Sequence, residues 1–136
     1  MGLALLDSNT VVGFLDADDP LHEAADRAMR AAAADHSFAV SVVTLAEVLT
    51  GAKLGHHDEA TVRRFFDQVV SQRIPIDRPT AERAAELRAS RRALKMPDAL
   101  ILATADRSAA VMLTGDQKWL KTPGLACDLR YVAHRG

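Results

Sequence analysis

Cysteine is nearly absent from this sequence: Cys127 is the only one in 136 residues. An internal disulfide is therefore excluded, as is typical of proteins of the reducing cytoplasm. No apolar run approaches the roughly 18 residues that a membrane span needs, and residues 1–6 lack the basic region of a secretion signal. These absences predict a cytoplasmic protein without a membrane-spanning segment.

Aromatic residues and net charge are also scarce, at 4% and −1. So few aromatic side chains exclude an array on which nucleotide bases could stack, and we expect Trp119 to be a packing anchor. The charge is uneven, because residues 1–26 hold six acids and no Lys or Arg, whereas residues 73–95 hold seven bases and three acids. Such a division suits an enzyme that steers phosphates toward bound metal, although two differently solvated faces explain it equally well.

The hydrophobic content of 49% is enough to bury one core, so we expect residues 1–136 to form a single domain. Apolar runs predict strands at 3–6, 38–40, 111–113 and 129–132, and an edge strand at 74–76. Helical patterns predict helices at 11–15, 20–34, 44–54, 60–71, 79–94 and 97–109, and a short helix near Trp119. Asp19 is the expected cap of the second helix and Pro20 its first residue. The alternation predicts an α/β sandwich with a mainly parallel central sheet flanked by helices.

Four acidic residues fall where such a sheet would gather ligands. Asp7 and Asp116 follow two predicted strands, and Glu47 and Asp98 lie in the first turns of two predicted helices. Ligands of open parallel sheets bind beyond the carboxyl ends of the strands, so we expect the four side chains to converge. Two carboxylates about 4 Å apart repel by roughly 4 kcal/mol at an effective dielectric near 20, and either protonation or a cation must relieve this repulsion. Oxygen ligands without a His or Cys set favour Mg²⁺ or Mn²⁺ over zinc.

Each acid also has an ordinary structural explanation. Asp7 or Ser8 could cap a helix, and Thr44-Leu45-Ala46-Glu47 has the form of a capping box. Asp98 could oppose a helix dipole, and Asp116 could belong to a Thr-Gly-Asp turn. Taken as a set with their order and surroundings, the four acids favour a metal site.

The chain resembles the PIN-domain nucleases, and specifically the VapC-type toxins of bacterial toxin–antitoxin modules. The resemblance is carried by four blocks: Leu5-Leu6-Asp7-Ser8-Asn9, Ser41-Val42-Val43-Thr44-Leu45-Ala46-Glu47-Val48, Pro97-Asp98-Ala99-Leu100-Ile101-Leu102-Ala103-Thr104-Ala105 and Leu113-Thr114-Gly115-Asp116. It implies a PIN-like three-layer sandwich, a Mg²⁺- or Mn²⁺-dependent endoribonuclease acting on RNA, a homodimer, and a cognate VapB-type antitoxin that occupies the acidic cleft.

The resemblance also assigns roles to individual residues. It makes Asp7, Glu47, Asp98 and Asp116 both the catalytic residues and the metal ligands. Asn9 and Thr114 match positions that often support the site through hydrogen bonds. The block ending in Asp116 departs from the family pattern, because many relatives have Asn where this chain has Gly115.

Two other functions are compatible with the residues. Asp7-Ser8-Asn9-Thr10 resembles the Asp-x-Asp-x-Thr motif of haloacid-dehalogenase-like phosphatases, with Lys118 as the phosphate-binding lysine, but Asn9 replaces the acid/base partner of that chemistry. A PIN-like binding module that keeps the fold without cleavage is the non-enzymatic alternative, and the intact set of four acids argues against it.

Several further residues have alternative interpretations. A basic group could contact RNA phosphates or form a solvated helix face: Arg88, Arg91, Arg92 and Lys95. An apolar group could receive an antitoxin helix or pack into the core: Val11, Val12, Phe14 and Leu15. We expect His56 and His57 to be exposed loop residues because they lack a partner at metal-ligand spacing, and Asp106 to be a surface acid.

Overall fold

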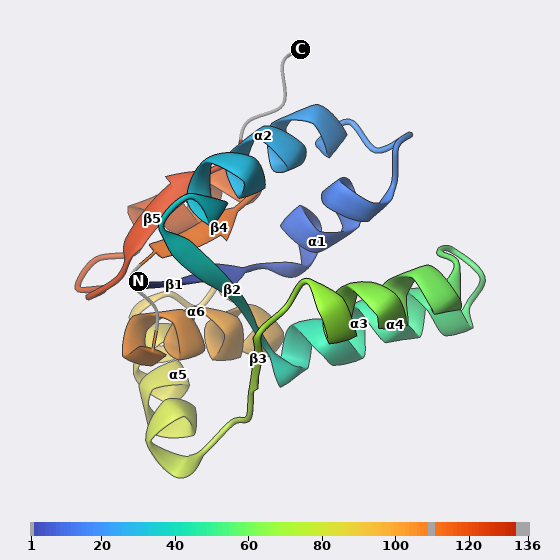
Figure 1. The fold of residues 1–136 in the computed structure, drawn as a ribbon. Helices are drawn as coiled ribbons and strands as arrows, with labels where there is room; N and C mark the ends of the chain where they lie inside the picture. Colours follow the sequence, from blue (N-terminus) through green and yellow to red (C-terminus); the bar gives the residue numbers. More distant parts are fainter. Residues whose placement is uncertain (1, 109–110, 133–136) are drawn as a thin grey trace.

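A five-stranded sheet forms the centre of the molecule (Figure 1). The structure is a computed structural model that describes residues 2–108 and 111–132. The strands are β1 (Gly2–Leu6), β2 (His36–Ser41), β3 (Gln72–Ile74), β4 (Val111–Thr114) and β5 (Asp128–Tyr131). Their order is β3-β2-β1-β4-β5, and every neighbouring pair is parallel. The predicted parallel sheet is therefore confirmed. The predicted strand at 74–76 does lie at the edge of the sheet, but it spans Gln72–Ile74 and ends before Pro75.

Helices cover both faces of this sheet. They are α1 (Ser8–Leu15), α2 (His22–Ala33), α3 (Val42–Lys53), α4 (Glu59–Gln68), α5 (Arg78–Ser90) and α6 (Met96–Ser108), with a 3-10 helix η1 (Gln117–Lys121). One core cluster joins the sheet to α1, α2, α3 and α4, and the other joins it to α5, α6 and η1. Figure 1 shows α1 and α2 on one side of the strands and α5 and α6 on the other. The predicted three-layer sandwich is confirmed.

The central strand β1 explains why the sheet needs cover on both faces. Ala4 and Leu6 belong to one core cluster and Leu5 to the other, and all three are fully buried. Side chains alternate between the two faces of a strand. A strand buried on both faces therefore has a continuous apolar run, which is the pattern seen in residues 3–6.

Side-chain caps place two helix starts earlier than predicted. The carboxylate of Asp7 accepts a hydrogen bond from the Thr10 backbone N–H at 2.7 Å, so α1 begins at Ser8 instead of residue 11. The hydroxyl of Ser41 accepts from the Val43 N–H at 3.1 Å, so α3 begins at Val42. Thr44 therefore lies inside α3 and does not cap it.

The predicted start of the second helix is wrong. The helix α2 begins at His22, and its N-cap residue, Leu21, makes no side-chain cap bond. Asp19 instead closes a turn before the helix, because its carboxylate accepts from the Leu21 N–H at 2.8 Å and its carbonyl from the His22 N–H at 2.9 Å. Pro20 lies in that turn.

The ends of α5 and α4 come three or more residues earlier than predicted. The helix α5 ends at Ser90, because Arg91 adopts extended backbone angles, and α4 ends at Gln68. The helix α6 is described to Ser108. The predicted end at Ala109 lies outside the described residues.

The single cysteine and the single tryptophan are both core residues. Trp119 is 4% exposed, which confirms the predicted packing anchor. Cys127 is a buried free thiol whose pKa is raised to about 11, first by burial and then by the charge of Asp106. A thiol with such a pKa is almost wholly protonated near neutral pH, so it packs as a small apolar group. Within the described residues, none of the helices has both the length and the hydropathy needed to cross a membrane.

The packing of α1 against the start of α2 gives a prediction for Gly13. A Cβ atom at Gly13 would lie 2.9 Å from the Cβ of Leu21 and 3.4 Å from its carbonyl carbon. We expect Gly13→Ala to lower the free energy of unfolding by roughly 1–3 kcal/mol. Ala stabilises a helix interior by about 1 kcal/mol relative to Gly, so the clash with Leu21 must cost more free energy than this gain.

Gly51→Ala is the matched control within another helix. A Cβ there would meet only the edge of the His57 ring, at 2.9 Å, and that ring can turn away. Urea denaturation should show Gly51→Ala to be neutral or stabilising. Equal stability changes in the two variants would contradict the proposed contact with Leu21.

Candidate metal centre

The four predicted acids line one hollow at the carboxyl end of the sheet. This hollow has a volume of about 130 Å³ and is lined by Asp7, Ser8, Asn9, Glu47, Asp98, Ile101, Asp116 and Trp119. Asp7 directly follows β1 and Asp116 lies two residues after β4; because these strands are parallel neighbours, both acids leave the sheet at the same edge. The other two come from the second turn of α3 and the first turn of α6.

Asp7 is the buried centre of this group, with 1% of its surface exposed. One carboxylate oxygen accepts from the Thr10 N–H at 2.7 Å. The other accepts from the Thr114 hydroxyl at 2.7 Å and from the Gly115 N–H at 3.2 Å. Burial raises the pKa of Asp7, while the hydrogen bonds from Thr114, Thr10 and Gly115 oppose that rise. The capping explanation is therefore correct for Asp7, and the same carboxylate also faces the hollow.

Thr114 connects the first and last acids. Its hydroxyl donates to Asp7 and accepts from the Asp116 N–H at 3.0 Å. These bonds are of the kind that the family resemblance implies for this position. Asn9, the other expected supporting residue, is exposed at the hollow, and its side chain makes no hydrogen bond among the described residues.

Glu47 is held by a residue that sequence reasoning did not select. The Ser8 hydroxyl donates to a carboxylate oxygen of Glu47 at 2.6 Å and lies 3.4 Å from the Thr44 hydroxyl oxygen. Because Ser41 caps α3, the capping-box explanation of Glu47 is wrong. Ser8 directly follows Asp7 in the sequence, but no local pattern pairs it with a residue 39 positions away.

The remaining two acids carry charge into the same space. Asp116 caps η1, accepting from the Lys118 N–H at 2.9 Å. The pKa of Asp98 is raised by burial and then by the negative charges of Glu47, Asp116 and Asp7. Across residues 2–108 and 111–132, none of the ion pairs involves any of the four acids. The centre thus has an excess of negative charge.

The donor chemistry of the hollow fits a hydrated Mg²⁺ or Mn²⁺ ion. All four candidate ligands are carboxylates, which these hard cations prefer. In the part of the chain that the structure describes, no three His, Cys, Asp or Glu side chains lie close enough together to hold a metal ion directly. Mg²⁺ usually keeps several waters and is bound through one or two carboxylates, so an open arrangement suits it better than a tight cage would.

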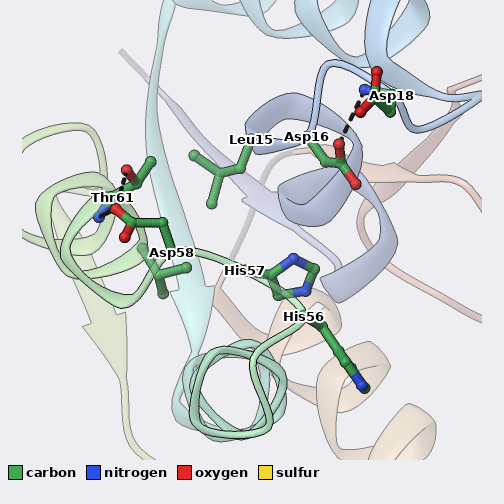
Figure 2. Close-up of a pocket in the computed structure, with 8 residues that line it drawn as sticks. Leu15, Asp16, Asp18, His56, His57, Asp58 and Thr61 are labelled. Atoms are coloured by element: carbon green, nitrogen blue, oxygen red, sulfur yellow. Dashed lines mark hydrogen bonds between the residues drawn. The ribbon is translucent and has the colours of Figure 1, made fainter.

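A larger hollow, of about 360 Å³, lies at the other end of α1 (Figure 2). Its acids are used in local turns, because Asp16 accepts from the Asp18 N–H at 2.9 Å and Asp58 accepts from the N–H and hydroxyl of Thr61. Figure 2 shows the ring of His57 directed into the hollow and that of His56 directed away. His56 is exposed as predicted, whereas the prediction for His57 is wrong, because its half-buried ring packs on α3.

The other candidate residues lie wholly or partly in the interior. Asp106 is not a surface acid: its side chain is 11% exposed and pairs with Arg83 at 2.8 Å. Val11 is fully buried in the core. Val12, Phe14 and Leu15 are partly buried and pack against the same core, so the apolar patch is largely an interior feature.

Comparison with known proteins identifies a family for this chain. The family model described as the PIN domain matches residues 4–125. The chain belongs to the PIN-domain family. No match is found among curated proteins.

Solved structures of similar fold come from several bacteria. A toxin–antitoxin complex from Klebsiella pneumoniae is 29% identical, with a TM-score of 0.76 and coverage of 97% of this chain and 99% of that one. The VapBC2 complex from Rickettsia felis, bound to a promoter DNA fragment, is 18% identical, with a TM-score of 0.77 and coverage of 95% and 98%. VapC20 from Mycobacterium tuberculosis, described as a Sarcin–Ricin loop cleaving toxin, is 16% identical, with a TM-score of 0.68 and coverage of 92% and 98%.

The crowded charge of this PIN domain gives a prediction for Asp98. Because the pKa of Asp98 is raised, there is a pH range above 3.8 in which the folded protein keeps a proton that the unfolded chain has lost. The metal-free wild-type protein therefore loses stability as the pH rises from 3.8, the ordinary Asp value, through the raised pKa. Asp98→Asn removes this loss, so we expect it to stabilise the metal-free protein near neutral pH by on the order of 1 kcal/mol, or about 4 °C. Thermal denaturation in EDTA from about pH 4 to about pH 8 should show the gain growing with pH.

Asp7→Ala is the contrasting variant in the same cluster. It also removes a negative charge, but it leaves the N–H groups of Thr10 and Gly115 and the Thr114 hydroxyl without their acceptor. We expect it to lower stability by roughly 2–4 kcal/mol. Strong destabilisation by Asp98→Asn as well would show that Asp98 serves α6 and does not add repulsion.

Proposed function

We propose that this chain is a Mg²⁺- or Mn²⁺-dependent endoribonuclease that hydrolyses RNA phosphodiester bonds, formed as one PIN domain over residues 1–136. The observation that carries the proposal is the arrangement of four carboxylates from four distant segments around one hollow. No ion pair within the described residues balances these charges, and Asp98 is affected by the other three acids. A structural role for each acid alone does not account for their convergence.

The chain's own residues would hold and orient the cation. Asp7, Glu47, Asp98 and Asp116 would be its ligands and thereby the catalytic residues. When bound, a divalent cation lowers the pKa of a coordinated water and stabilises charge on the phosphate, so no protein nucleophile is needed. Thr114 keeps Asp7 and the Asp116 backbone in place, and Ser8 keeps Glu47 directed toward the hollow.

We further propose that the nuclease is the toxin of a toxin–antitoxin pair. The support is the family match together with similarity to chains of solved toxin–antitoxin complexes. This similarity extends over almost the whole length of both chains. The proposed partner is a VapB-type antitoxin that covers the acidic hollow, and the proposed assembly is a cytoplasmic homodimer. The lone buried cysteine is compatible with a reducing compartment.

The alternatives have less support. For a haloacid-dehalogenase-like phosphatase, Asn9 stands where the acid/base partner is needed, and the Thr10 hydroxyl is used in a hydrogen bond to the Leu113 carbonyl at 3.0 Å. Lys118 is exposed and lies on η1. A PIN-like module without cleavage would keep the same fold, so only an activity measurement separates it from the nuclease.

The proposed chemistry predicts metal-dependent RNA cleavage that requires Asp98. The wild-type protein should cleave a fluorogenic RNA with Mn²⁺ and lose this activity in EDTA. Asp98→Asn should lower the rate at least a hundredfold, because it weakens metal binding. Circular dichroism should show that the variant remains folded.

Asp128→Asn is the matched control, because Asp128 is an exposed acid on β5 with 71% of its side chain accessible. It should cleave as the wild type does. A phosphomonoester assay run in parallel tests the phosphatase alternative. Mn²⁺ binding by calorimetry without any RNA cleavage would support the binding module and contradict the nuclease.

The toxin role predicts an effect on growth. Induced expression of the wild-type chain should arrest growth, and Asp98→Asn should remove the arrest because the proposed toxicity depends on cleavage. Co-expression of the cognate antitoxin should restore growth. Normal growth at an expression level that yields confirmed active enzyme would contradict the toxin role without affecting the nuclease.

A further inference from the structure

Two exposed basic segments lie beside the acidic hollow. Arg92 and Lys95 belong to the connection between α5 and α6, and Lys118 and Lys121 belong to η1. Among the described residues, none of these four side chains takes part in an ion pair or a hydrogen bond. We name the four residues the basic rim.

Two neighbouring arginines hold these segments together. The Arg91 guanidinium donates to the Thr122 hydroxyl at 2.7 Å, which joins the α5–α6 connection to the end of η1. The Arg88 guanidinium donates to the Leu94 carbonyl at 2.8 Å, which joins the end of α5 to the last part of the connection. Arg88 and Arg91 therefore have structural partners, whereas Arg92 and Lys95 remain available.

The geometry of η1 directs its lysines to one side. Residues three apart in a 3-10 helix share a face, so Lys118 and Lys121 lie one above the other. Trp119 lies on a different face and is buried against the core that includes α6. The buried ring thus anchors η1 while both ammonium groups remain exposed.

One residue of each segment lies next to an acid of the hollow. The Lys118 N–H donates to the Asp116 carboxylate. Lys95 directly precedes α6, its carbonyl accepts from the Ala99 N–H at 2.9 Å, and its positive charge acts to lower the pKa of Asp98. A chain of phosphates that reaches the acidic hollow would therefore pass these cations.

We propose that the basic rim binds the phosphates of single-stranded RNA next to the cleavage site. This inference rests on the proposed nuclease function, but it concerns binding and can be tested apart from cleavage. Phosphates bind Lys and Arg through a salt-dependent, sequence-independent attraction. Unpaired cations beside an acidic hollow offset the repulsion that its carboxylates exert on a polyanion.

The test measures binding of a fluorescein-labelled oligouridylate by anisotropy at several salt concentrations. All proteins carry Asp98→Asn and are measured with Mg²⁺, and gel electrophoresis checks that the RNA stays intact. Lys118→Gln with Lys121→Gln should raise Kd roughly tenfold and reduce the slope of log K against log salt by about 1.4, or about 0.7 for each lost contact. Arg92→Gln with Lys95→Gln should have a similar effect.

The matched control is Arg27→Gln with Arg30→Gln on α2, which removes two positive charges from the opposite face of the sheet. Its Kd and salt slope should equal those of the parent. Rim variants that bind RNA like the parent would overturn the inference. So would a changed oligomeric state with unchanged RNA affinity, because the rim would then bind protein.

Cleavage data keep the two proposals separate. RNA cleavage by the wild type, combined with normal RNA binding by the rim variants, would reject RNA binding by the basic rim and leave the nuclease proposal intact. Weakened binding by the rim variants, combined with no cleavage by the wild type, would reject the nuclease alone.

Discussion

The site depends on one buried carboxylate that accepts hydrogen bonds from two separate segments. Asp7 follows β1, caps α1 through Thr10, and accepts hydrogen bonds from Thr114 at the end of β4 and from Gly115 just after it. Because a buried charge without partners would be very costly, these bonds determine how the two strand ends approach each other. The carboxylate that would bind metal is thus also the one that joins the two strand ends.

The rest of the centre is arranged at some cost in stability. Hydrogen bonds satisfy Asp7, but Asp98 has mainly like charges around it. The fold can tolerate this repulsion because its central strand and α6 are buried in continuous apolar surroundings. This repulsion at one edge of an apolar sheet is what the proposed cation would relieve.

Structural and functional roles coincide at several residues. Asp7 and Asp116 are helix caps, and both line the hollow. The arginines divide differently, because Arg91 is bonded to Thr122 while Arg92 is free at the surface. A local explanation for a charged residue therefore does not exclude a functional one, and only its contacts decide between them.

The sequence by itself determined the strands, the helices and the edge where the acids meet. Apolar periodicity and capping act over a few residues, so β1, the cap of α1 and the positions of Asp7 and Asp116 could be predicted. The start of α2 could not be predicted, because the Asp19 carboxylate can serve equally well in a helix cap or in a turn. In the structure it closes the turn before the helix. Only the tertiary structure decided that Ser8 holds Glu47, that Asp106 pairs with Arg83, and that Thr114 bonds a residue 107 positions away. Such contacts join segments with no local relation, and they arise only when the packed sheet brings those segments together.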